Sequence, residues 1–247
     1  MHWNHSAKTA PLPVLCHNRV MKLFRYCLLS LSLVACTAGP PASPPSAAPA
    51  ADTVTGWYQK AAQAGRKVYL IDASQSLITV TVRRGGALAR FGHDHVVASR
   101  SIEGFAAPDA GRADFHFRLD QMTVDETALR TGAGLNTQPP ADAIEGTRAN
   151  MLTRVLEAER FPVVTLHAER LPGAADVVRL TVTLHGVTRT QDVPVLVERS
   201  GASLAASGEL KLKQTDFGVT PMSVMGGAMT VQDQMELKFR IVAMAQR

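Results

Sequence analysis

The sequence predicts an all-β domain of about eight antiparallel strands, arranged as a barrel or a sandwich with one short helix. Apolar and polar side chains alternate with a two-residue period over 113–120, 178–185, 204–213 and 235–242. This alternation gives each strand one dry face and one wet face. A helical spacing of apolar residues interrupts the pattern at 140–161. Closure into a barrel removes exposed strand edges, and a barrel of about eight strands can enclose one slender ligand.

Shorter runs with strand character extend the predicted sheet beyond the four clearest segments. We expect these additional strands at 67–72, 76–83, 88–98, 163–170 and 192–198. Before them, residues 53–66 favour a short helix or turn, and Trp57 and Tyr58 in this segment are expected to pack on the barrel.

The segment from Pro140 to Phe161 is predicted to be the helix. Asp142 is the expected N-cap, and Phe161-Pro162 ends the helix because proline disfavours helical backbone in the residue before it. Its apolar residues at helical spacing are Ile144, Met151, Leu152, Val155 and Leu156. Two interpretations remain open: a lid or plug that covers one barrel end, or a connector that only covers part of the core.

Charge and cysteine content narrow the possible functions. The chain has 26 basic and 21 acidic residues, but residues 1–35 contain four of the basic ones and no acidic one. The remainder is therefore nearly neutral, which argues against nucleic acid as a partner. All three cysteines lie within the first 36 residues. We therefore expect no disulfide, thiolate nucleophile or cysteine-bound metal in the folded domain.

The first 35 residues have the features of a bacterial signal peptide. Lys22 and Arg25 precede the apolar segment from Cys27 to Ala35, which is too short to span a bilayer of about 30 Å as a helix. Met21 is a possible true start. The predicted organisation is a signal peptide at 1–35, a Pro- and Ala-rich tether at 36–66 and the barrel domain at 67–247.

A lipid anchor is expected at Cys36. Leu33-Val34-Ala35-Cys36 resembles the lipobox of bacterial lipoproteins, which implies cleavage before Cys36 and attachment of lipid to its thiol. Thr37 after this cysteine favours sorting to the outer membrane, so the expected location is the periplasm, anchored to a membrane. The alternatives are an ordinary signal peptide cut nearby and a buried apolar segment.

His93-Asp94-His95 is the most chemically specific motif of the domain. If the motif lies on a strand, both imidazoles project from one face and can bind a metal ion. A third ligand would be needed, from His116, His167 or His185. The other interpretations are hydrogen bonds that order loops at the barrel mouth, and a polar contact with a ligand headgroup. A metal-binding envelope protein or a metal-dependent enzyme using His93 and His95 is therefore the alternative function.

Common catalytic motifs are missing from the sequence. It contains no G-x-S-x-G, no H-E-x-x-H and no glycine-rich phosphate loop. We therefore expect a binding protein rather than an enzyme.

Four segments, in order, resemble the YceI-like family of periplasmic proteins. They are Val68–Asp72 with Ser76–Ile78, Met151–Leu166, Leu180–Arg189 and Lys213–Val219. The resemblance implies an eight-stranded antiparallel lipocalin-like β-barrel with an elongated apolar channel. It also implies a polyisoprenoid or isoprenoid quinone as the bound ligand.

The apolar faces of the strands would then line the channel. The residues expected to line it are Phe91, Phe115, Phe117, Leu119, Leu180, Val182, Leu184, Leu210, Leu237 and Phe239. Burial of an uncharged hydrocarbon against such side chains is favourable by about 25 cal/mol per Å².

Overall fold

The computed structural model describes residues 51–174 and 176–246. The predicted signal peptide, Cys36 and the first part of the tether lie outside the described residues. No helix within these two ranges has the length and hydropathy to cross a membrane.

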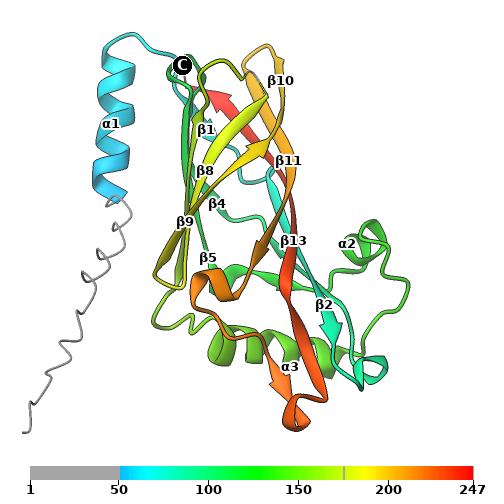
Figure 1. Ribbon diagram of the computed structural model, residues 1–247. Helices are drawn as coiled ribbons and strands as arrows, with labels where there is room; N and C mark the ends of the chain where they lie inside the picture. Colours follow the sequence, from blue (N-terminus) through cyan, green and yellow to red (C-terminus); the bar gives the residue numbers. More distant parts are fainter. Residues whose placement is uncertain (1–50, 175, 247) are drawn as a thin grey trace, which may run out of the picture. The chain divides into compact units, whose positions relative to one another are not determined.

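A single antiparallel sheet of thirteen strands forms the domain (Figure 1). The strands are β1 (Tyr69–Ile71), β2 (Leu77–Gly85), β3 (His95–Ser99), β4 (Ile102–Ala107), β5 (Arg112–Arg118), β6 (Thr123–Val124), β7 (Val163–Arg170), β8 (Val177–Leu184), β9 (Val187–Pro194), β10 (Leu196–Ser200), β11 (Ser203–Lys213), β12 (Ser223–Val224) and β13 (Met229–Ala245). Hydrogen bonds connect them in the order β6-β3-β2-β13-β1-β4-β5-β7-β8-β9, and β13 also pairs with β11 and β12. The all-β prediction is confirmed. Several of the strands are so short that the periodicity of the sequence does not distinguish them as separate strands.

Strand β13 is the central strand because it pairs along both of its edges. One edge pairs with β11 over eleven residues, and the other pairs first with β2 and then with β1. Ser76 bridges the gap between β1 and β2. Its buried hydroxyl accepts a hydrogen bond from the Val242 amide at 3.0 Å, while the Asp72 amide donates to the Val242 carbonyl at 2.8 Å.

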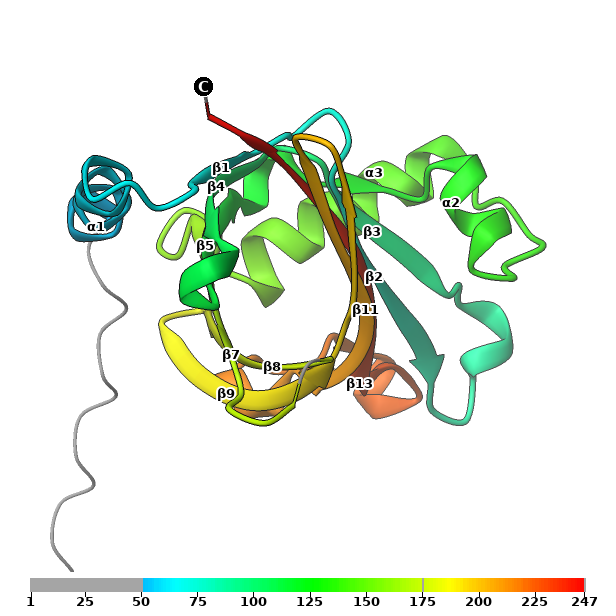
Figure 2. The same ribbon diagram turned by 90° about the horizontal axis from the view of Figure 1, so that it is seen from above.

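The sheet curves around a common interior, with β5, β7, β8, β9, β11 and β13 arranged around it in the end-on view (Figure 2). No hydrogen-bonded ladder joins β9 to β10 or β11 across the described strands. Gly208 in β11 lies where β9 approaches, because a Cβ there would come within 2.8 Å of both the Pro194 carbonyl oxygen and the Phe239 ring. The barrel is therefore brought together at this point by close packing, and its sheet is not fully closed by hydrogen bonds.

Two strand predictions need correction. The segment 88–98 begins with a 3-10 turn at Ala89–Phe91, and β3 starts only at His95. The Asp94 carboxylate accepts a hydrogen bond from the Arg84 amide at 2.9 Å. This side-chain contact replaces the backbone hydrogen bond that a neighbouring strand would otherwise make with the Arg84 amide. The segment 192–198 is divided at Val195, whose amide donates to the Asp176 carbonyl.

Three helices accompany the sheet: α1 (Ala51–Gln63), α2 (Thr127–Gly132) and α3 (Ala141–Asn150). Helix α2 was not predicted. Helix α3 continues as a π-helical turn at Met151–Val155, and its N-cap is Pro140 rather than Asp142, which lies in the first turn. Helix α3 lies at the lower end of the barrel in Figure 1, and its apolar residues pack on the main core.

Helix α1 packs on the outside of the barrel beside β4, as expected for Tyr58 (Figure 2). Tyr58 is 1% exposed, and its ring stacks on Phe105 with centroids 5.1 Å apart. Its hydroxyl donates to Asp114 at 2.8 Å, and burial raises the pKa of the phenol. Trp57 remains partly exposed under the Arg112 guanidinium, which lies 4.6 Å from the indole ring. The helix is thus fixed by both apolar and polar contacts.

Asp114 is shared by three donors beneath α1. Arg112 Nε lies 2.7 Å and His167 Nδ1 lies 2.6 Å from its oxygens, in addition to Tyr58. Burial acts to raise the pKa of Asp114, but the hydrogen bonds from His167, Arg112 and Tyr58 outweigh it and lower this pKa. The hydrogen bond to Asp114 is also the main cause that raises the pKa of His167 above its ordinary 6.5.

From the contact between His167 and Asp114 we predict a contribution to the stability of the fold that depends on pH. A raised folded-state pKa means that protonated His167 stabilises the fold below its ordinary pKa, and that this contribution disappears as pH rises through the folded-state value. Urea unfolding of the wild type and His167→Gln is expected to show a wild-type advantage at about pH 5.5 that shrinks by about 1 kcal/mol at about pH 8.5. An equal advantage at both pH values would contradict the ionic role of His167.

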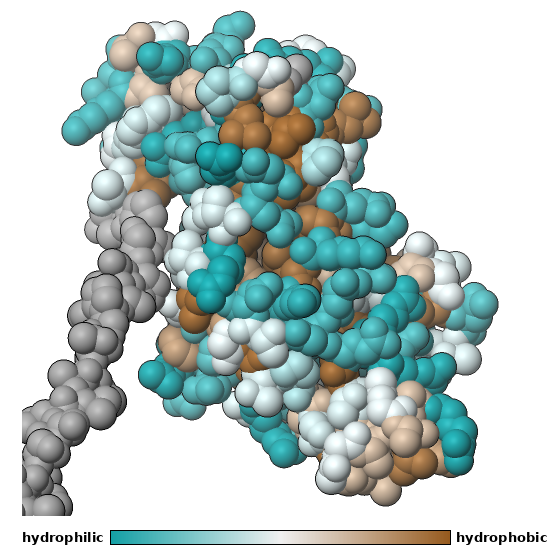
Figure 3. Space-filling model, in the orientation of Figure 1, coloured by the Kyte–Doolittle hydropathy of each residue, from teal (hydrophilic) through white to brown (hydrophobic). Residues whose placement is uncertain are grey.

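The outward face of the strands is mostly hydrophilic, as the alternation predicts. Figure 3 shows polar side chains over much of the visible surface, with apolar side chains between them. The larger apolar side chains that remain exposed are Leu70, Phe91, Leu196, Val197, Val224, Met225 and Met244. The remaining apolar side chains of the strands largely face the interior, where the core also borders a cavity.

Candidate ligand cavity

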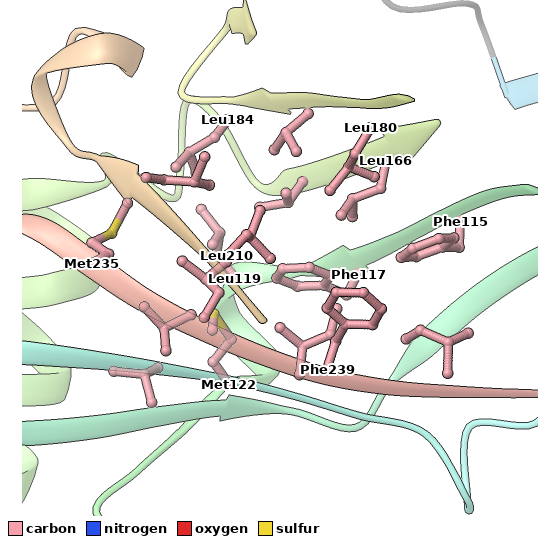
Figure 4. A pocket seen from close by; sticks show the side chains of 18 of the residues that line it. Phe115, Phe117, Leu119, Met122, Leu166, Leu180, Leu184, Leu210, Met235 and Phe239 are labelled. Atoms are coloured by element: carbon pink, nitrogen blue, oxygen red, sulfur yellow. The ribbon is translucent and has the colours of Figure 1, made fainter. Parts of the chain in front are cut away.

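An apolar cavity of about 380 Å³ runs through the barrel interior (Figure 4). This volume is within the range of about 300–1,000 Å³ that is typical of small-molecule sites. On β13, lining residues extend from Val231 to Ala243, with a register irregularity between Val231 and Met235. Since a strand advances about 3.3 Å per residue, the eight regular steps from Met235 to Ala243 correspond to about 26 Å along the strand. The cavity is therefore long as well as apolar.

Nine of the ten residues predicted to line a channel line this cavity. They are Phe115, Phe117, Leu119, Leu180, Val182, Leu184, Leu210, Leu237 and Phe239. Neighbouring strands place them together because the ladder register aligns their inward faces, as between Phe115 and Leu166 or Leu210 and Leu237. The two-residue alternation is sufficient to assign these faces on the strands, whereas Leu119 lies in a 3-10 turn directly after β5.

The prediction for Phe91 is wrong. Its side chain is 63% exposed and does not line the cavity. Phe91 belongs to the 3-10 turn before β3, where the two-residue alternation of a strand does not apply. The Arg90 guanidinium lies 4.5 Å from the ring centroid instead.

Other lining residues were missed by the sequence reasoning. Ile78, Val80 and Val82 on β2 alternate in the sequence and line the cavity, so their signal was present. Met151, Val155 and Leu156 also line it, from the segment that follows α3. Because this segment contributes to the cavity wall, the interpretation as a plug at one barrel end is favoured over a simple connector.

Four polar residues contribute to the lining, and no Lys, Arg, Asp or Glu does so among the described residues. They are His95 on β3, Thr147 and Asn150 on α3, and Gln214 after β11. Gln214 is 5% exposed and donates from Nε2 to the Gln232 carbonyl at 2.9 Å. Nothing in the sequence periodicity marks Thr147 or Asn150, because their approach depends on how α3 crosses the barrel end. Gln214 continues the two-residue series of Leu210 and Leu212.

His95 is held by a buried ionic network. Its Nδ1 lies 2.6 Å from Oδ2 of Asp125, whose other oxygen accepts from Arg130 at 2.6 Å and from the Val96 amide at 3.0 Å. Asp125 and Arg130 have side chains only 0% and 2% exposed. Burial acts to raise the pKa of Asp125, but the hydrogen bonds from His95, Val96 and Arg130 lower it below its ordinary value.

The predicted pairing of His93 with His95 does not form a metal site here. His93 precedes β3 and is exposed, and the two ring centroids are 6.2 Å apart in an edge-on arrangement. The three candidate third ligands have other carboxylate neighbours: His116 faces Glu103, His167 binds Asp114, and His185 faces Glu157. Among the residues with described positions, no group of three potential His, Cys, Asp or Glu ligands is brought together.

The fold and cavity define a class of protein: an antiparallel β-barrel built around a long, uncharged and mainly apolar binding space. Residues 69–243 match the YceI-like domain. The chain belongs to the YceI-like family, which confirms the resemblance seen in its sequence segments. No curated protein was found to match the chain by sequence.

Two solved structures are similar to this chain at low sequence identity. A polyisoprenoid binding domain from Saccharophagus degradans, implicated in plant cell wall breakdown, has 15% identity and a TM-score of 0.51, and the match covers 72% of this chain and 98% of that chain. BcnA from Burkholderia cenocepacia has 17% identity and a TM-score of 0.49, with coverage of 70% and 98%. The first of these supports the lipocalin-like barrel architecture.

Proposed function

We propose that this protein binds one long isoprenoid lipid, a polyisoprenoid or an isoprenoid quinone, without catalysing a reaction. The observation that supports this proposal best is the long cavity, whose described lining contains four polar residues and no Lys, Arg, Asp or Glu. A branched hydrocarbon chain gains free energy from burial in such an aliphatic space, less the entropic costs of binding. A protein similar in fold is described as a polyisoprenoid binding domain, which supports the same ligand class.

The proposal includes a location in the bacterial envelope. The apolar segment before Cys36 and the Pro- and Ala-rich residues after it favour a lipid-anchored chain in the periplasm, with the outer membrane preferred. A tether of this composition stays extended and lets the barrel reach lipid at a distance from its anchor. This arrangement suits a protein that carries or stores a lipid between membranes.

Mass spectrometry of the full chain, purified from the membrane fraction of its native host, tests both the lipid-binding function and the lipid anchor. We expect the organic extract to contain an isoprenoid lipid in near-stoichiometric amount, and the peptide that begins at Cys36 to carry diacylglycerol. A Leu180→Glu chain, purified in parallel, controls for lipid that adheres outside the cavity. An extract without enriched lipid would contradict the binding function, and an unmodified Cys36 peptide would contradict the anchor.

A further inference from the structure

The cavity is chemically different at its two ends. Strand pairing places His95 opposite Val82 and Val82 opposite Met235, so the polar residue His95 lies at the α3 end. At the other end, the lining residues on paired strands are apolar, and several of them are alanines. The alanines are Ala106, Ala113, Ala168 and Ala243. A ligand with one polar terminus therefore has a preferred direction in the barrel.

The polar end presents oriented hydrogen-bonding groups. Because the Asp125 carboxylate can only accept, the contact of 2.6 Å places a proton on His95 Nδ1. In neutral His95 this leaves Nε2 as an acceptor, and the Thr147 hydroxyl lies at a long 3.5 Å from it. A ligand hydroxyl can donate to Nε2 and accept from the Thr147 hydroxyl or the Asn150 amide, whereas a ligand carbonyl can accept only from Thr147 and Asn150.

Among the described residues, no Lys or Arg lines this end of the cavity to balance a buried anion, and Arg154, which lies 3.5 Å from the Asn150 side-chain oxygen, is exposed. Arg130 is the nearest guanidinium of the network, and it is 2% exposed behind Asp125. Its nitrogens already donate to Asp125 at 2.6 Å, to the Asp94 carbonyl at 2.7 Å and to the Thr137 carbonyl at 2.8 Å. A phosphate or diphosphate placed at this end would lose hydration without gaining an ion pair.

We propose that the α3 end binds an uncharged oxygen group. The hydroxyl of a prenol would donate to His95 Nε2 and accept from Thr147 or Asn150, whereas the carbonyl of a prenylated quinone would accept from Thr147 and Asn150 alone. This inference rests on the proposed lipid-binding function and specifies its headgroup. The isoprenoid tail then runs from the polar end toward the alanine-lined end. The network of Asp125 and Arg130 acts as a positioning device for His95 and does not itself contact the ligand.

Competition among three ligands with one shared branched chain tests the proposal. The full chain is loaded with the fluorescent probe N-phenyl-1-naphthylamine, which is then displaced by phytane, phytol or phytyl diphosphate. We expect phytol to bind about tenfold more tightly than phytane, the effect of about one hydrogen bond, and more tightly than phytyl diphosphate. Equal binding of phytol and phytane, or tightest binding of the diphosphate, would overturn the headgroup proposal.

Substitutions test whether the preference for phytol over phytane arises from residues that line the cavity. Thr147→Val and His95→Leu are expected to reduce the preference for phytol over phytane, measured as the ratio of the two dissociation constants. Thr183→Val is the matched control, because Thr183 pairs with Thr188 at 2.8 Å and does not line the cavity. An unchanged phytol preference in Thr147→Val and His95→Leu would overturn the site. Failure of all three ligands to displace the probe would instead contradict the lipid-binding function.

Discussion

Leu180→Glu is expected to weaken binding of an apolar ligand by about 100-fold or more. Leu180 is 6% exposed on β8 and lines the cavity at the level of Ala168. A carboxylate at this position either remains ionised in an apolar space or becomes protonated at a cost in free energy. Either outcome places a polar, hydrated group where the hydrocarbon would lie. Displacement of a fluorescent apolar probe measures the loss directly.

Thr181→Glu provides the control for Leu180→Glu because it changes the next residue of the same strand. Thr181 projects from the opposite face, where its hydroxyl lies 2.9 Å from that of Thr190. We expect near-normal ligand binding and a change in the free energy of unfolding of about 0.5 kcal/mol or less. Normal binding by Leu180→Glu would mean that the inward and outward faces are wrongly assigned.

Asp125→Ala is expected to lower the free energy of unfolding by about 3–5 kcal/mol. The substitution leaves the Arg130 guanidinium, 2% exposed, without its carboxylate partner. It also removes the hydrogen-bond acceptor for His95 Nδ1 and the Val96 amide. Urea unfolding followed by circular dichroism measures the effect, which should be larger than that of replacing an exposed ion pair.

Two further variants distinguish the causes of the stability lost in Asp125→Ala. Asp125 has a left-handed backbone with φ of 57°, which Asn tolerates better than Ala, so Asp125→Asn should be less destabilising. Adding Arg130→Met to Asp125→Ala should restore part of the lost stability, because the unpaired charge is removed as well. A double variant as unstable as the sum of its single substitutions would show that the two residues act independently.

Local patterns in the sequence were sufficient for much of the barrel. The segment 163–170 coincides with β7, and the alternation over 113–118 assigns the inward Phe115 and Phe117 on β5. Such patterns work because the side-chain period of a strand is two residues, so one buried face determines the other. They failed for Phe91, where a 3-10 turn replaces the expected strand.

The polar end of the cavity was decided by tertiary structure. His95 could be recognised as a polar candidate, but its partner Asp125 is 30 residues away and its neighbour Thr147 is 52 residues away. Their meeting depends on how β3, α2 and α3 pack together at one end of the barrel. The periodicity of a short segment carries no information about that packing. Contacts between such distant segments form only once the whole sheet has curved and brought them together.

The sequence by itself thus determined the class of fold, the aliphatic character of the interior and the family. Alternation and composition act residue by residue, so they can be seen without coordinates. Only the tertiary structure decided that the cavity is long and that α3 encloses one of its ends. It also decided that no ladder of hydrogen bonds closes the sheet between β9 and β11, and that His95 rather than His93 faces the interior. These properties depend on register, curvature and helix placement, which are set jointly by many distant contacts.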